Sequence, residues 1–341
     1  MPNKYILLRI KIIWVMIKKG KISLKKIFNL LHCYAAYFLK WEKSAPSPYL
    51  IQFELWNECN ESCVFCRDEN DEIFDLNPNG QGTSIPKGKM PFETYAGTLS
   101  QVKDRLIMSI PYMNGEPLLS KDVYKAIQFA SDLKISTLIA TNGILMNDAN
   151  CTKLLDAGLD FVKVHISGFT QPIHSIQHRQ GDVELIKKNL RNLVQKNKEG
   201  KYELLIMLDY ILYEHNKDEV ELARKFCADL GIMFNIRMGN PKGMEDSEKP
   251  QFSGSLPVDV HCDWLWTTLA IDWDNSIYPC CEHVVWNDAE SYEKFDGEQT
   301  NVKQLWNGPK AITMREIHLN QGRAPIPICA ECPKTGVTFK F

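Results

Sequence analysis

The chain has 341 residues, of which 44% are hydrophobic and 24% charged, and its net charge at pH 7 is −2. These values are ordinary for a soluble globular protein with one large core or two moderate ones. The eleven cysteines are too sparse for a small disulfide scaffold, and most of them fall into clusters, which points to bound metal and a reducing compartment.

The first 45 residues are strongly basic. They hold ten Lys/Arg residues and one acid, Glu42, so this segment carries +9 and the rest of the chain −11. Lysines interrupt every apolar run, so none reaches the ~20 residues that span a bilayer, and no signal-peptide pattern is present. Two alternatives stay open: a basic amphipathic helix in an anionic membrane interface, or a helix packed on the next domain with a solvated lysine face. Nucleic acid is not an expected partner.

A Pro-rich linker follows, and strands then alternate with helices. The predicted strands cover residues 49–56, 105–108, 137–140, 161–167, 203–212 and 233–238. The predicted helices cover residues 121–133, 151–157, 183–197 and 217–230. Such alternation predicts an α/β fold with a parallel sheet, which right-handed crossovers curl into a partial (β/α) barrel of the TIM type.

The polar stretch 241–254 ends this alternation, and a short-stranded, Cys-rich region follows with a predicted hairpin at residues 272–281. We therefore divide the chain into a basic helical segment (1–45), a partial barrel (46–240) and a small C-terminal β-hairpin and helix domain (241–341).

Three cysteines, Cys59, Cys63 and Cys66, lie on one polar loop directly after the first predicted strand. An iron–sulfur cube is normally held by four thiolates, so a loop with three either borrows a fourth or leaves one iron open to another ligand. Zinc sites usually combine Cys-x-x-Cys with a second Cys or His pair, and the first spacing here is one residue too long. The loop therefore favours an iron–sulfur cluster over zinc.

This loop and three later motifs, in the same order, resemble the radical S-adenosylmethionine (SAM) superfamily with a C-terminal SPASM/Twitch-type iron–sulfur domain. The resemblance covers residues 49–332 and implies that the loop holds a [4Fe–4S] cluster whose open iron binds SAM. The segment around Asn114, Gly115 and Glu116 is similar to the family's Gly-Gly-Glu-Pro motif, with Asn114 in place of the first glycine. Gly115 would allow close backbone approach, and Glu116 would accept a hydrogen bond from the amino group of SAM.

The resemblance assigns further SAM contacts to the ends of later strands. Thr141 and Asn142 close the third strand and Ser167 the fourth, where the family places ribose and methionyl contacts. Arg179 is either a ligand of the SAM carboxylate or a surface arginine at a helix start. Phe65 matches an aromatic residue that packs against adenine.

The C-terminal cysteines form the last motif. Cys262, Cys280, Cys329 and Cys332 are spaced as in SPASM/Twitch domains and imply one auxiliary [4Fe–4S] cluster, because four thiolates close the cube completely. Structural zinc is the alternative. The adjacent Cys281 could replace Cys280 as a ligand, donate a hydrogen atom to a substrate radical, or only pack.

These motifs imply a radical SAM enzyme. Reductive cleavage of SAM would give a 5′-deoxyadenosyl radical that abstracts a hydrogen atom from a carbohydrate, nucleotide-linked or peptidyl substrate, with oxidation or epimerisation as the outcome. The alternatives are a maturase of a ribosomally made peptide and a non-catalytic iron–sulfur electron carrier or scaffold. The expected electron donor is a flavodoxin or ferredoxin. The expected location is cytoplasmic, at the inner membrane surface if residues 1–43 contact lipid.

Overall fold

The computed structural model describes residues 3–67, 85–239, 259–284, 290–296, 300–330 and 332, and the side chains from residue 9 onward. The predicted polar stretch 241–254 lies outside the described residues.

One mixed sheet organises the described chain, in the order β11-β10-β9-β1-β3-β4-β5-β7-β8. All neighbours from β9 to β8 pair in parallel, and β10 and β11 are antiparallel additions. The parallel strands are β1 (Leu50–Phe53), β3 (Met108–Ile110), β4 (Ser136–Thr141), β5 (Phe161–Ile166), β7 (Leu205–Leu212), β8 (Met233–Met238) and β9 (Thr268–Ile271). The predicted α/β architecture is confirmed.

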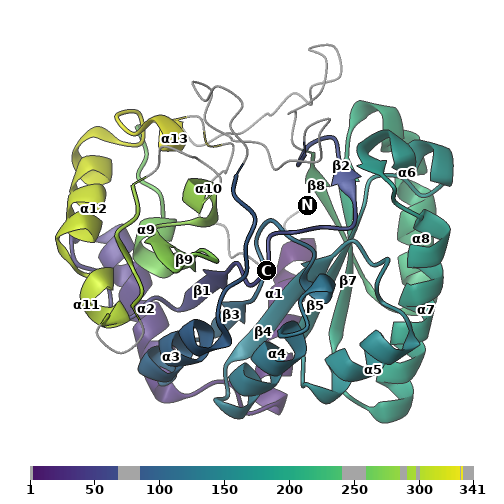
Figure 1. Cartoon of the computed structure of the whole chain (residues 1–341), viewed down its shortest axis with the longest axis horizontal. Helices are drawn as coiled ribbons and strands as arrows, with labels where there is room; N and C mark the ends of the chain where they lie inside the picture. The colour runs from purple at the N-terminus through teal and green to yellow at the C-terminus, as the bar shows by residue number, and fades with distance from the viewer. Residues whose placement is uncertain are drawn as a thin grey trace.

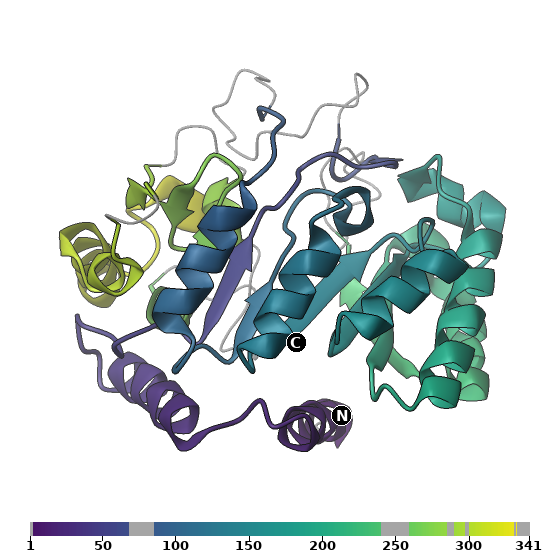
Figure 2. The same cartoon turned by 60° about the horizontal axis from the view of Figure 1, so that its bottom comes forward.

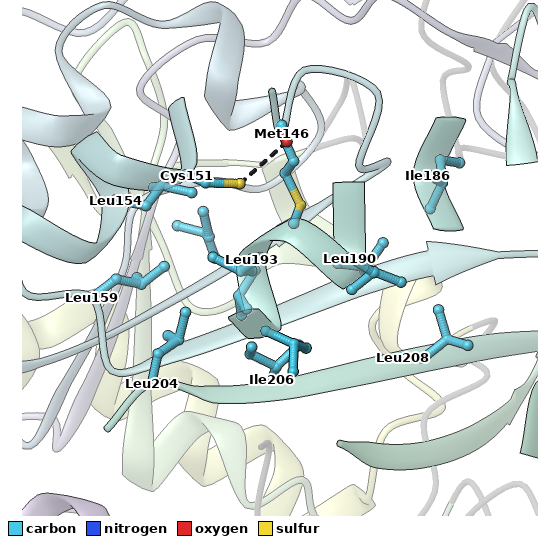
Figure 3. Packing of buried hydrophobic residues seen from close by; sticks show 14 of the residues in the cluster. Met146, Cys151, Leu154, Leu159, Ile186, Leu190, Leu193, Leu204, Ile206 and Leu208 are labelled. Atoms are coloured by element: carbon cyan, nitrogen blue, oxygen red, sulfur yellow. Dashed lines mark hydrogen bonds between the residues drawn. The ribbon is translucent and has the colours of Figure 1, made fainter. Parts of the chain in front are cut away.

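Helices cover the outer face of this sheet (Figure 1). They are α3 (Phe92–Val102), α4 (Val123–Asp132), α5 (Asp148–Asp156), α7 (Val183–Gly200) and α8 (Val220–Leu230). Alternation along β5 sends Val162 and Val164 outward, where they share a core with Ile186 and Leu190 of α7. Figure 3 shows part of this core, in which the Cys151 thiol donates to the Met146 carbonyl at 3.1 Å.

Several element bounds differ from the prediction. Helix α3 was not predicted, nor was α6 (Gln171–Gln177), and β3 begins where its predicted strand ended. The predicted helix 217–230 is a 3₁₀ turn, η2 (Glu214–Glu219), followed by α8, which ends at Gly231 with φ of +72°. That left-handed conformation suits glycine and stops the helix.

The N-terminal segment forms two helices, α1 (Asn3–Lys18) and α2 (Leu24–Phe38), which lie across the end of the barrel where its strands begin (Figure 2). Ile12 and Met16 of α1 pack against inward-facing strand residues such as Leu138. The helix connection is held by a buried ion pair between Lys21 Nζ and Asp160 Oδ2 at 2.6 Å. Among the described helices, none is both long and apolar enough to cross a membrane.

The C-terminal region continues the barrel sheet. It contains α9 (Trp264–Thr267), β9, β10 (Ser276–Tyr278), α10 (Cys281–Val284), β11 (Glu293–Lys294), α11 (Val302–Trp306), α12 (Pro309–Gln321) and α13 (Pro327–Ala330). The predicted hairpin is the antiparallel β9–β10 pair. Strand β9 also pairs in parallel with β1, which places the Cys-rich region at the edge of the barrel.

Candidate functional site

The cysteine loop leaves the C-terminal end of β1 and is anchored by a short two-stranded sheet. In this sheet β2 (Ser62–Cys63) pairs with β6 (His178–Arg179) in antiparallel fashion. The N–H groups of Cys66 and Arg67 both donate to the Cys63 carbonyl at 2.9 Å, which curls the loop around its second cysteine. The loop therefore has a defined conformation held by residues more than a hundred positions away.

The three thiols fit an iron–sulfur cluster. Burial raises the pKa of Cys59 to about 12 and that of Cys63 well above its ordinary value, and the thiolates of Cys66 and Cys59 contribute to the rise at Cys63. The sulfurs are thus close enough to repel one another as anions. A bound metal would stabilise their thiolate forms.

Glu116 connects the turn at Asn114–Glu116 with Thr141 and Asn142 at the end of β4. Its Oε1 accepts hydrogen bonds from Thr141 Oγ1 at 2.7 Å and from the Leu118 N–H at 3.1 Å, and its Oε2 accepts from the Asn142 N–H at 2.9 Å. The side-chain nitrogen of Asn142, Nδ2, lies 3.8 Å from Cys59 Sγ. Burial raises the pKa of Glu116 to about 7. The structure therefore brings Cys59, Glu116, Thr141 and Asn142 together at the strand ends.

Gly115 is required by the close approach of two chain segments. A Cβ atom at this position would lie 1.9 Å from the Trp56 carbonyl oxygen, which no other residue type tolerates without a shift of the backbone. The following N–H, that of Glu116, donates to the Glu58 carbonyl at 2.8 Å. The turn is thereby fixed against the chain that leads into the cysteine loop.

Glu54, just after β1, holds the same turn and was missed by sequence reasoning. Its buried carboxylate accepts hydrogen bonds from the N–H groups of Met113, at 3.2 Å, and Asn114. Burial raises the pKa of Glu54 to about 8. The available signal was an acidic residue inside the mostly apolar run Ile51–Trp56.

A cluster of buried polar side chains lies next to Cys63 and is centred on His178. His178 Nδ1 is 2.9 Å from Glu61 Oε2 and 3.4 Å from Cys63 Sγ, and His178 Nε2 is 2.9 Å from Ser167 Oγ. The His174 ring stacks on that of His178 with centroids 4.4 Å apart. Ser167, predicted to touch SAM, is here a hydrogen-bond partner of His178. Glu61 and the two histidines are further residues that sequence reasoning missed.

Phe65 lies on the cysteine loop, and Arg179 of β6 contacts that loop. Arg179 Nε donates to the Ser62 carbonyl at 2.6 Å, and its NH2 group donates to the Arg67 carbonyl at 2.9 Å. These bonds give Arg179 a role in shaping the loop, while binding of the SAM carboxylate stays a prediction. The Phe65 ring meets the His178 ring edge-on at 5.5 Å, and its contact with adenine also stays a prediction.

The C-terminal cysteines gather around Cys280. Burial raises the pKa of Cys280 well above its ordinary value, and the thiolates of Cys281, Cys329 and Cys262 add to the rise. Cys332 in turn contributes to the raised pKa of Cys329. This proximity fits a second cluster or a zinc ion, because a bound metal would stabilise the neighbouring thiolates. The Cys281 thiol lies 3.9 Å from Glu282 Oε1.

The inner face of the barrel carries a polar group beside the site. Asp209 accepts hydrogen bonds from Asn235 Nδ2 at 2.6 Å and from Arg237 Nε at 2.8 Å, and its Oδ2 lies 3.4 Å from His165 Nε2. These residues come from neighbouring strands β5, β7 and β8. Burial and the Arg237 charge lower the pKa of His165 to about 3, so this imidazole is neutral.

Comparison with known families agrees with this geometry. The sequence model of the radical SAM superfamily matches residues 53–227, and that of an iron–sulfur cluster-binding domain, SPASM, matches residues 262–333. The chain therefore belongs to the radical SAM superfamily. The first domain implies a [4Fe–4S] cluster with SAM and the second implies auxiliary iron–sulfur binding, for which the cysteines are present.

Individual relatives are distant. The chain is 24% identical to a probable GTP 3′,8-cyclase of Methanocaldococcus jannaschii over 54% of this chain and 57% of the relative. It is 30% identical to an AdoMet-dependent heme synthase of Methanosarcina barkeri over 38% of this chain and 34% of the relative. The structure resembles Streptococcus suis SuiB bound to the precursor peptide SuiA, with a TM-score of 0.60 and 13% identity, over 81% of this chain and 68% of that chain.

Proposed function

We propose that this radical SAM enzyme abstracts a hydrogen atom from a carbohydrate, nucleotide-linked or peptidyl substrate, with oxidation or epimerisation as the net result. The bound cluster and SAM would supply the radical chemistry, namely reductive formation of a 5′-deoxyadenosyl radical. Cys59, Cys63 and Cys66 would hold the cluster. Cys262, Cys280, Cys329 and Cys332 would hold one auxiliary cluster.

The observation that carries this proposal is the link from Cys59 through Asn142 to Glu116. Three separate motifs meet there at the C-terminal ends of β1, β3 and β4, the edge where such barrels place their catalytic groups. The Glu116 carboxylate is positioned by Thr141 and Asn142, so it would present a fixed acceptor to an ammonium group. Phe65 and the buried strand ends would keep water away from the reacting groups.

The inner-face polar group supports a substrate with polar or charged groups. Asp209 is buried, whereas the side chain of its partner Arg237 is 45% exposed and could reach a ligand over the barrel mouth. The named relatives act on a nucleotide and in heme synthesis, and SuiB was solved with a peptide. Their variety favours no single substrate class, so a maturase of a ribosomally made peptide is the principal alternative.

We also propose a flavodoxin or ferredoxin as the one-electron donor, and a cytoplasmic location with peripheral membrane contact through residues 1–43. The partial exposure of Cys59 and Cys66 supports reduction by an external protein. The surplus of basic residues in the N-terminal segment supports contact with an anionic surface.

Anaerobic reconstitution with iron and sulfide, followed by SAM and dithionite, tests the enzyme proposal. We expect 5′-deoxyadenosine from the wild type and from the matched control Cys227→Ala, a buried thiol of α8 far from the site, but none from Cys63→Ala. An intact cluster without 5′-deoxyadenosine would favour the electron carrier or scaffold. Mass spectrometry of metabolite and peptide pools from cells with and without the gene would then identify the substrate class.

A further inference from the structure

Helices α1 and α2 present an apolar surface to solvent. Of the fifteen large hydrophobic side chains that are exposed in the described residues, eleven fall between residues 10 and 41. In each helix they recur at the i, i+3, i+4, i+7 spacing of one helical face. We call this surface the apolar face; it consists of Ile10, Ile13, Trp14, Ile17, Leu24, Ile27, Phe28, Leu31, Phe38, Leu39 and Trp41.

The apolar face takes no part in docking α2, because another side of the helix is buried, with Lys26 and Asn29 in its first half. Lys26 Nζ donates to the Lys134 carbonyl at 2.5 Å, and Asn29 Nδ2 donates to the Ser47 carbonyl at 2.8 Å. Leu24 and Phe28, by contrast, are 72% and 67% exposed. The first half of the helix thus buries polar groups and its second half buries Cys33, Ala36 and Tyr37, while the apolar face points to solvent. Exposed large apolar side chains gathered on one segment mark an interaction site.

The charges around the apolar face fit an anionic lipid surface. Exposed lysines accompany it, namely Lys11, Lys18, Lys25, Lys40 and Lys43, and Glu42 is the one exposed acid among residues 9–43. Lys18 and Lys25 also pair with Glu203 and Asp104 of the barrel, so the positive charge offered to a lipid surface comes mainly from Lys11, Lys40 and Lys43. Trp14 and Trp41 are the residue type that favours the boundary between lipid and water. A cavity of about 210 Å³ lies beside Phe28, and apolar atoms form most of its lining.

We propose that the apolar face of α1 and α2 binds an anionic phospholipid bilayer. The end of the barrel that carries the cysteine loop and Glu116 then faces away from the bilayer. This inference rests on the peripheral location proposed above and adds the surface and the orientation. The helices contact residues that precede strands, through Lys18 with Glu203 and Lys21 with Asp160. The cysteine loop follows β1 and Glu116 follows β3, so both lie at the other end of the strands. The eight residues of β7 separate the two ends by about 25 Å, so the substrate enters from the aqueous side.

Vesicle flotation of the full chain tests the surface. With phosphatidylcholine vesicles containing about 30% phosphatidylglycerol, we expect binding at least about tenfold stronger than with phosphatidylcholine alone. The double variant Phe28→Asp/Leu31→Asp should lose this binding, whereas the matched control Leu222→Asp, an exposed leucine of α8, should keep it. Binding that survives the double variant, or no vesicle binding by the wild type, would overturn the proposal.

Quenching of tryptophan fluorescence by brominated lipids tests the orientation. We expect Trp14→Phe to reduce the quenching and Trp273→Phe, next to β9 at the far end, to leave it unchanged; the reverse would overturn the orientation.

Light scattering of the free protein tests whether a second copy of the chain binds the apolar face instead. A dimer that Phe28→Asp/Leu31→Asp abolishes would assign the surface to a second copy and overturn the lipid proposal. SAM cleavage by the double variant should equal that of the wild type, so failure of lipid binding is distinguishable from failure of the proposed reaction.

Discussion

Asp272, which follows β9, raises the pKa of Glu54, which follows β1, because the two carboxylates lie at adjoining ends of paired strands. Burial is the larger cause, and the pKa of Glu54 reaches about 8. Burial likewise raises the pKa of Asp272 to about 7. Since Glu54 also accepts from the Met113 N–H, the C-terminal region is coupled electrostatically to the turn that carries Gly115 and Glu116.

This coupling predicts a pH-dependent stability. A carboxyl group whose pKa is higher in the folded than in the unfolded chain stabilises the fold at low pH, and that contribution disappears as the pH rises through the folded pKa. The melting temperature should therefore fall between about pH 5 and pH 8. Asp272→Asn should flatten the fall, because it removes one titrating group and lowers the pKa of Glu54. Calorimetry of wild type, Asp272→Asn and the exposed control Asp104→Asn measures this; parallel curves for all three would contradict it.

Gly115→Ala should abolish SAM binding while leaving the barrel folded. The added methyl group would lie 1.9 Å from the Trp56 carbonyl oxygen, so the turn that positions Glu116 must move. Equilibrium dialysis with SAM and circular dichroism measure the two properties separately. Gly231→Ala is a control with open space around its Cβ, although its positive φ costs about 1 kcal/mol of stability. Retained SAM binding by Gly115→Ala would mean that the turn is less constrained than the contacts indicate.

Asp160→Asn should destabilise the protein by roughly 3 kcal/mol, because removal of one partner from a buried ion pair leaves the other charge unpaired. The carboxylate of Asp160 meets Lys21 Nζ at 2.6 Å and Lys19 Nζ at 3.1 Å, and also accepts from the Thr137 N–H at 2.8 Å. Urea unfolding gives the free energy change. Asp104→Asn breaks an exposed pair with Lys25 and should cost less than about 0.5 kcal/mol.

Cys280→Ser and Cys281→Ser should differ in iron content. Burial and the neighbouring cysteines, Cys329 and Cys262 among them, raise the pKa of Cys280, and we propose Cys280 as the auxiliary ligand. Reconstituted Cys280→Ser should then hold about four iron atoms per chain and Cys281→Ser about eight, the wild-type value for two cubes. Iron and acid-labile sulfide analysis decides between them. The opposite result would exchange the roles of the two cysteines.

The sequence predicted the barrel and the edge that holds the site, because strand periodicity and the position of each motif after a strand are local properties. It did not predict Glu54, Glu61 or His178, whose partners are far away in the chain. The predicted amphipathic character of residues 1–45 was compatible with either alternative, since a periodic pattern does not say which face points inward. The structure shows which side of α2 faces out, because Lys26, Asn29 and Cys33 are buried while Leu24 and Phe28 are exposed.

Pairing of β9 with β1 has a practical consequence for dissecting the protein. A fragment that ends before residue 259 would leave the backbone N–H and C=O groups along one side of β1 without partners. Unprotected strand edges recruit other chains into intermolecular sheets. The barrel expressed alone should therefore aggregate even with its cysteine loop intact, so its chemistry is best studied by point substitution rather than by truncation.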